Sequence, residues 1–174
     1  MEMRPQNERS EGYMETERKY TIKELPAKLD TLDRKKIIQA YLCREPVVRI
    51  RRSDDEYYMT YKGKGFVQRE EYNLPLTKEA FEHLLEKADG NVISKTRYLI
   101  PLEEARFKDG YRLPDGVELC IELDVFDEPL APLVIAEVEF PDMECADAYI
   151  PEDWFDEDVS EDPAYHNVNM VYQR

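Results

Sequence analysis

Charged residues on alternate positions of strand-like segments are the feature that most constrains how this chain folds. In the segment Glu15-Thr16-Glu17-Arg18-Lys19, two carboxylates and an ammonium occupy every second position. Residues i, i+2 and i+4 of a β-strand point to the same face, so these three charges would share one face. A half-buried strand normally has an apolar face, and this segment has none. We therefore expect its inward face to line a site for a metal ion and an anion instead of an apolar core.

The same alternation recurs along the chain. At least six segments place polar or charged residues on one face and mostly apolar residues on the other. The later polar positions are Arg49 and Arg51, Tyr58, Thr60 and Lys62, Arg69, Glu71 and Asn73, Lys95 and Arg97, Cys120, Glu122 and Asp124, and Glu137 and Glu139. One such pair usually marks a solvated strand face, but a series of them is consistent with a closed barrel that has one charged face and one apolar face.

Hydrophobic periodicity predicts many strands and few helices. The expected strands are Tyr13–Ile22, Lys36–Cys43, Val47–Arg52, Glu56–Lys62, Phe66–Leu74, Val92–Ile100, Arg106–Arg112, Val117–Phe126 and Leu133–Phe140, with a Pro114-Asp115-Gly116 turn joining the strands on either side of it. The expected helical segments are a short turn at Leu25–Leu29, a helix capped by Thr77 that extends to Ala88, and one or two short helices after Pro141. The sequence thus predicts a mainly β (α+β) fold, in which consecutive antiparallel hairpins close into a barrel.

Length and composition restrict the class of protein. The 174 residues are most consistent with one domain, which we expect to cover residues 13–174 after a polar tail at 1–12. A net charge of −15 argues against binding to nucleic acid or to acidic membranes. No apolar run approaches the roughly 20 residues that span a bilayer. Three cysteines without metal-ligand spacing favour reduced thiols, and therefore a cytoplasmic protein.

Periodicity alone does not decide whether the charged faces point outward to solvent or inward to a tunnel. The distribution of charge favours the tunnel, because basic residues gather on the middle strands and carboxylates gather on the first and last strands. An acidic wall of hard oxygen donors suits Mg²⁺ or Mn²⁺. A basic wall of guanidinium and ammonium groups suits phosphate. The sequence therefore predicts a site for a metal and a phosphate-rich anion.

Several short motifs occur in an order that resembles the CYTH superfamily, the triphosphate tunnel metalloenzymes. The matching motifs are Glu15-x-Glu17-x-Lys19, Ile38-Gln39-Ala40-Tyr41-Leu42, Val48-Arg49-Ile50-Arg51, Tyr61-Lys62-Gly63, Arg69-x-Glu71, Lys95-Thr96-Arg97-Tyr98, Glu122-Leu123-Asp124-Val125-Phe126, Ala136-Glu137-Val138-Glu139-Phe140, Asp158-Val159 and Tyr165-His166-Asn167. Two positions depart from the family pattern: Asn73 replaces a frequent acid, and Ala40 replaces a usual glycine. The resemblance implies an eight-stranded antiparallel closed β-barrel with a few covering helices.

The resemblance also implies roles for individual residues. The residues implied to hold Mg²⁺ or Mn²⁺ are Glu15, Glu17, Glu137 and Glu139. Further acidic residues are implied to pair with basic residues, join a second metal or orient water: Glu71, Glu122 and Asp124. The residues implied to bind the phosphate chain are Lys19, Arg49, Arg51, Lys62, Lys95 and Arg97. The catalytic candidates are Tyr41, Lys95 and Glu71. Tyr41 is also consistent with a packed barrel tyrosine, because an unperturbed phenol is a poor base at neutral pH.

The function that the resemblance implies is metal-dependent hydrolysis of inorganic tripolyphosphate to pyrophosphate and phosphate. Two alternatives keep the same barrel: a class IV adenylate cyclase, or a thiamine or nucleoside triphosphatase. A third is a non-catalytic module that binds polyphosphate. We expect a small anionic triphosphate as the partner, no nucleic acid polymer and no membrane, and a monomer or homodimer.

Overall fold

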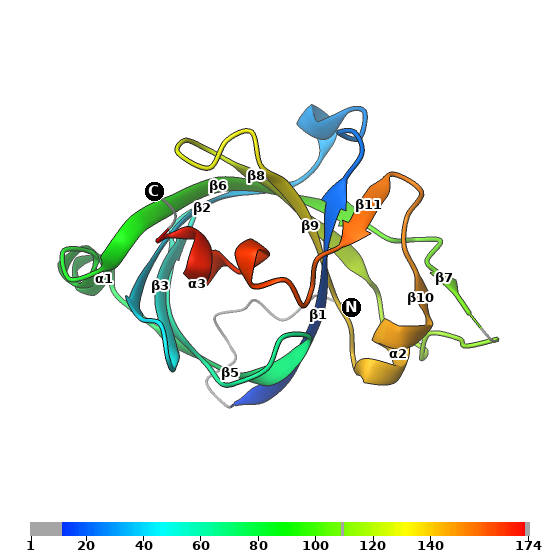
Figure 1. The fold of residues 1–174 in the computed structure, drawn as a ribbon, viewed down its shortest axis with the longest axis horizontal. Coiled ribbons are helices and arrows are strands. Elements are labelled where there is room, and N and C mark those ends of the chain that lie inside the picture. Colours follow the sequence, from blue (N-terminus) through cyan, green and yellow to red (C-terminus); the bar gives the residue numbers. More distant parts are fainter. Residues whose placement is uncertain (1–11, 109, 173–174) are drawn as a thin grey trace.

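A computed structural model describes residues 12–108 and 110–172 of this chain, and its main feature is a closed barrel (Figure 1). Eight antiparallel strands follow the order β1-β5-β4-β3-β2-β6-β8-β9, and β9 pairs with β1 to close the ring. Their bounds are β1 Tyr13–Ile22, β2 Arg34–Cys43, β3 Val47–Ser53, β4 Glu56–Lys62, β5 Gln68–Pro75, β6 Asp89–Pro101, β8 Cys120–Phe126 and β9 Val134–Glu139. The expected eight-stranded barrel is confirmed. The predicted polar tail lies outside the described residues, apart from Gly12.

Strand β1 closes the barrel by pairing with two different strands along its length. Its first part pairs with β5, where Glu15 is opposite Arg69. Its second part pairs with β9, where Lys19 is opposite Glu137. Because both registers place these residues on the same inward face, the charges of the first strand meet those of a middle strand and of the last barrel strand.

Apolar outward faces of the strands are covered by short helices. Helix α1 (Lys78–Leu85) packs Phe81 against Ala40 and Ile50, and its Thr77 cap accepts a hydrogen bond from the Ala80 amide at 3.1 Å. Helix α2 (Met143–Ala148) contributes Cys145 and Ala146 to a second cluster over β8, β9 and β1. This cover is what allows the polar faces of the strands to point inward. No helix within the described residues has the length and apolar character that crossing a membrane requires.

The end of the chain enters the barrel opening instead of covering an outer face. The short elements η3 (Pro163–Tyr165) and α3 (Asn167–Met170) lie within the ring of strands in Figure 1, drawn in red. Met170 and Val171 pack on four inward side chains, which we call the apolar collar: Tyr41, Ile93, Phe126 and Ile135. The C-terminal segment therefore fills one end of the barrel.

Three local predictions were wrong. The segment from Arg106 forms only β7 (Arg106–Phe107), which pairs with β10 (Tyr149–Ile150) and not with the strand after the Pro114 turn. Its alternating aromatic residues, Phe107 and Tyr111, pack against the outer core instead. The expected helical turn at Leu25–Leu29 is replaced by η2 (Leu29–Thr31). The region after Pro141 also contains β11 (Phe155–Asp158), which pairs with β1.

Candidate active site

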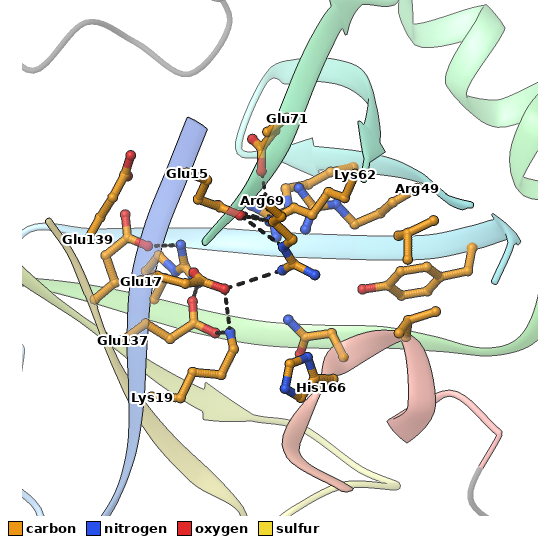
Figure 2. Close-up of a pocket in the computed structure, with 17 residues that line it drawn as sticks. Glu15, Glu17, Lys19, Arg49, Lys62, Arg69, Glu71, Glu137, Glu139 and His166 are labelled. Atoms are coloured by element: carbon orange, nitrogen blue, oxygen red, sulfur yellow. Dashed lines mark hydrogen bonds and ion pairs between the residues drawn. The ribbon is translucent and has the colours of Figure 1, made fainter. Parts of the chain in front are cut away.

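The charged faces of the strands point inward and line one chamber (Figure 2). The predicted site residues Glu15, Glu17, Lys19, Arg49, Arg51, Lys62, Glu71, Lys95, Arg97, Asp124 and Glu137 are all at most 8 % exposed. This burial confirms the tunnel and excludes the alternative in which the charged faces are solvated. The residues that line the chamber are Glu15, Glu17, Lys19, Tyr41, Val47, Arg49, Arg51, Lys62, Arg69, Glu71, Arg97, Glu122, Glu137, Glu139, His166, Asn167 and Val168.

Ion pairs connect the carboxylates of β1 to three cationic side chains. Lys19 Nζ lies 3.0 Å from Glu17 and 2.5 Å from Glu137. Arg69 reaches both Glu15 and Glu17 at 3.3 Å, and Figure 2 shows its guanidinium between them. These pairs compensate charges that would be very costly to bury alone.

Lys62 forms the third of these connections. Its Nζ donates to Glu15 at 2.6 Å and lies 2.7 Å from Glu71. Lys62 and Glu71 are opposite each other on β4 and β5, so the strand register itself sets up this pair. The acidic and basic walls are therefore in direct contact in this arrangement.

A second network surrounds Asp124. Its two oxygens accept from Arg97, with both contacts at 2.7 Å, and Lys95 also donates to it. Arg97 continues to Glu137 at 2.6 Å and to Glu122. Lys95 and Asp124 are completely buried and are not among the residues that line the chamber. They therefore lie behind Arg97 and hold it in place.

Arg49 and Arg51 differ from the other chamber cations because neutral groups hold them. Arg51 donates to Gln39 Oε1 at 3.0 and 2.7 Å and to the Tyr58 hydroxyl at 3.3 Å. Arg49 donates to Thr60 at 3.1 Å, and its buried Nε has no hydrogen-bond partner among the described residues. An orphaned buried donor is costly, and an anionic oxygen would satisfy it.

The ionisation of the chamber groups follows from burial and from these contacts. Burial alone would raise the pKa of Glu17, but the cations Lys19, Lys62 and Arg69 together outweigh it and lower that pKa to about 2. Lys19 and Arg97 likewise overcome burial and hold the pKa of Glu137 well below its usual value. Burial lowers the pKa of Lys95 to about 8, against the opposing effect of Asp124. The carboxylates of Glu17 and Glu137 are thus ionised at neutral pH.

The donor set fits a hard divalent cation that substrate helps to bind. Across the described residues, no three His, Cys, Asp or Glu side chains are gathered as a ready metal site. Chamber carboxylates form ion pairs with lysines and an arginine instead. Glu15, Glu17, Glu137 and Glu139 nevertheless line the same chamber. Mg²⁺ is commonly held by one or two carboxylates together with substrate phosphates. These four carboxylates therefore fit a divalent cation such as Mg²⁺ when phosphate oxygens of the substrate supply the remaining ligands.

The sequence matches the family model of the CYTH domain over residues 14–161. The chain belongs to the CYTH family. This CYTH protein is 38 % identical over 124 residues to an inorganic triphosphatase of Nitrosomonas europaea, a match that covers 71 % of this chain and 74 % of that one. It is 33 % identical over 133 residues to an inorganic triphosphatase of Acetivibrio thermocellus, and this match covers 74 % of this chain and 73 % of that one.

Solved structures agree with the fold of this CYTH protein. The crystal structure of an inorganic triphosphatase matches with a TM-score of 0.62 and 32 % identity, over 92 % of this chain and 95 % of the other. A putative adenylate cyclase from Bacillus halodurans matches with a TM-score of 0.55 over 82 % of this chain and 95 % of the other. At 15 % identity, the second likeness supports the barrel fold alone.

Most predicted site residues of this CYTH protein come together as expected. Tyr41 lines the chamber and also packs in the apolar collar, with its hydroxyl 3.3 Å from Gln39 Nε2. Its catalytic role stays a prediction. Asp124 has both oxygens engaged by Lys95 and Arg97, so this geometry gives it an ion-pair role, and metal binding by Asp124 is also only a prediction.

The prediction from sequence missed Gln39, which holds Arg51, and five residues that line the chamber, among them Val47 on β3. Arg69 shares the inward face of Glu71, so strand parity was a usable signal for it. Gln39 lies within a motif that resembles the family, but nothing in its spacing pointed to a role. The other three, His166, Asn167 and Val168, belong to the C-terminal segment. No periodicity marks that segment as part of the barrel interior.

Proposed function

We propose that this CYTH protein hydrolyses inorganic tripolyphosphate to pyrophosphate and phosphate with Mg²⁺ or Mn²⁺. One observation carries the proposal: beside a wall of carboxylates, a chamber inside the closed barrel holds two guanidiniums that pair with no carboxylate of the described residues. A phosphate chain complements the basic wall, and a divalent cation bound to that phosphate chain complements the acidic wall. Two relatives at 38 % and 33 % identity are named inorganic triphosphatases, which supports the same reaction.

Phosphate binding would begin at Arg49 and Arg51. Guanidiniums bind phosphate oxygens bidentately, and the buried Nε of Arg49, which no described residue satisfies, provides a donor that is already desolvated. Lys19, Lys62 and Arg69 would then turn from their carboxylates to phosphate oxygens and neutralise the rest of the chain. Arg97, which faces the chamber, would stabilise charge that develops on the leaving group.

A divalent metal would be held by Glu15, Glu17, Glu137 and Glu139. When bound, such an ion neutralises phosphate charge and lowers the pKa of water. Glu71 lines the chamber, where its carboxylate could orient the attacking water for in-line displacement. Lys95 lies behind Arg97, and we therefore assign it a positioning role through Asp124.

The reaction is tested by phosphate release from tripolyphosphate with Mg²⁺, with Mn²⁺ and after complete metal removal. We expect release only with metal, and none from Glu15→Gln. Release by the wild type after chelation of all metal would overturn the metal-dependent mechanism. A panel of ATP, thiamine triphosphate and long-chain polyphosphate, with cyclic AMP measured in parallel, separates the hydrolase from the cyclase and from a module that only binds.

We also propose the setting in which the protein acts. A small triphosphate is the expected partner, since the chamber is lined by buried charges and the chain carries a net charge of −15. The three cysteines are unpaired, which supports a reducing, cytoplasmic location. Light scattering would determine whether the protein is a monomer or a homodimer.

A further inference from the structure

The chamber cations fall into two classes according to the groups that hold them. Lys19, Lys62, Arg69 and Arg97 each contact at least one carboxylate. Within the described parts of the chain, Arg49 and Arg51 form no ion pair within 4.0 Å, and their hydrogen bonds go only to uncharged side chains. A cation that is paired with a carboxylate has its charge partly neutralised before phosphate binds, whereas the charges of Arg49 and Arg51 are not neutralised in this way.

Gln39 is the group that holds Arg51. The two residues are opposite each other on β2 and β3, and Gln39 is completely buried. Its Oε1 accepts from both Nε and Nη2 of Arg51, which fixes the plane of the guanidinium. Its Nε2 donates to the Tyr41 hydroxyl. A glutamate of the same shape could make the same two contacts to Arg51, but it would neutralise the arginine.

Asn73 holds Arg49 indirectly, because the Thr60 hydroxyl lies between them. Arg49 donates to Thr60 Oγ1, and this hydroxyl donates to Asn73 Oδ1 at 2.6 Å. The Asn73 amide then donates to Glu71 at 2.7 Å. Strand register places these residues side by side, because Thr60 is opposite both Arg49 and Asn73. Asn73 thus connects Thr60, which accepts from Arg49, to the Glu71 carboxylate, and it adds no charge of its own beside Arg49.

We propose that Gln39 and Asn73 are positioning residues that orient Arg51 and Arg49 while leaving their charge for the ligand. The chamber consequently binds a linear triphosphate without metal, through these two arginines, and the metal joins afterwards. This inference rests on the proposed triphosphate site and adds an order of binding to it. It also gives a reason for the amides at two buried positions directly behind Arg49 and Arg51.

The test is Gln39→Glu, with metal-free binding of tripolyphosphate measured by calorimetry in a chelator. We expect the glutamate to hold Arg51 more strongly, so the melting temperature of the ligand-free protein stays equal or rises. Metal-free affinity should nevertheless fall by about tenfold or more, since a hydrogen-bonded charge pair now competes with phosphate. With metal, KM should rise more than kcat falls. A merely structural role for Gln39 predicts unchanged binding in this variant.

Two controls make the result specific. Gln39→Met removes the acceptor without adding charge, so it should retain more metal-free affinity than Gln39→Glu. Gln68→Glu makes the same chemical change at an exposed position of β5 and should bind as the wild type does. Asn73→Asp is the second test variant, expected to weaken metal-free binding through Arg49, and it keeps the inference falsifiable if Gln39→Glu does not fold.

The outcomes separate this inference from the proposed reaction. Wild-type binding without metal, together with no hydrolysis in Mg²⁺ or Mn²⁺, would overturn the reaction and leave the inference standing. Hydrolysis by the wild type, together with wild-type metal-free affinity in both Gln39→Glu and Asn73→Asp, would overturn the inference alone. Absence of any metal-free binding by an active wild-type enzyme would also overturn it.

Discussion

Arg97 donates to Glu137 at 2.6 Å although the two residues lie on strands that are not neighbours. Arg97 is on β6 and Glu137 is on β9, and β8 lies between these strands in the sheet. Glu137 also accepts from Lys19 on β1. One carboxylate therefore connects the basic residues of a middle strand to the strand that closes the barrel.

Glu137→Gln tests this connection. The amide keeps the shape of the side chain but leaves Lys19 and Arg97 without their shared charge. We expect phosphate release to fall to background and the free energy of unfolding to decrease by about 3 kcal/mol, the cost of breaking a buried ion pair. Activity assays and denaturant titration measure the two effects. Glu82→Gln, on the exposed face of α1, should change neither, and an active, fully stable Glu137→Gln would show that the connection is dispensable.

Lys95 makes stability depend on pH in a defined direction. Its pKa is lowered from 10.5 in an unfolded chain to about 8 in the folded protein. Between these values the unfolded chain binds more protons, so the free energy of unfolding rises with pH from about 8 to 10.5. Lys95→Met should lack this rise. Denaturant titrations of both proteins over this range check it, and parallel pH curves would contradict it.

Strand parity predicted which residues share a face, and the distribution of charge among the strands then favoured an inward direction for the charged faces. The alternation in Glu15, Glu17 and Lys19 gave the inward face of β1, and the bounds of that strand agree with the structure. Local periodicity succeeds here because the two faces of each strand have different environments along the whole strand. Opposite charges on different strands could be assigned to facing walls, but their specific partners could not, because Arg97 pairs across an intervening strand.

The C-terminal part of the site was not predictable for a different reason. Asn167, Val168 and Met170 reach the barrel through contacts with residues far away in the sequence. A four-residue helix has too few turns to show a periodic apolar stripe. The tail motif signalled the family, but not that this segment would occupy the barrel opening.

Metal and substrate should bind cooperatively. Because Lys19, Lys62 and Arg69 occupy the chamber carboxylates, a metal alone must displace cations that have no other anion to bind. A triphosphate offers those cations new partners. We expect Mn²⁺ alone to raise the melting temperature slightly, and Mn²⁺ with a non-hydrolysable triphosphate analogue to raise it by more than the sum of the separate shifts. Thermal denaturation with each ligand alone and with both tests this, and additive shifts would contradict it.

Met170→Ala tests whether the packing of the C-terminal segment on the apolar collar supports the chamber. Met170 is buried against Ile93, Phe126 and Ile135, so its truncation should leave a cavity and cost about 2–5 kcal/mol of stability. Asn167 and Val168, which line the chamber, belong to the same helix. We therefore expect KM for tripolyphosphate to rise as well, measured where the variant is fully folded.

The matched control is Thr77→Ala, which removes the cap of α1 on the outer face and should cost about 1 kcal/mol. It lowers stability without contacting the collar, so its KM should equal that of the wild type. If Met170→Ala also leaves KM unchanged, the C-terminal segment only stabilises the barrel. If KM rises in Met170→Ala but not in Thr77→Ala, this segment is part of the substrate site. Both variants are destabilised, so lower stability alone would not raise KM in only one of them.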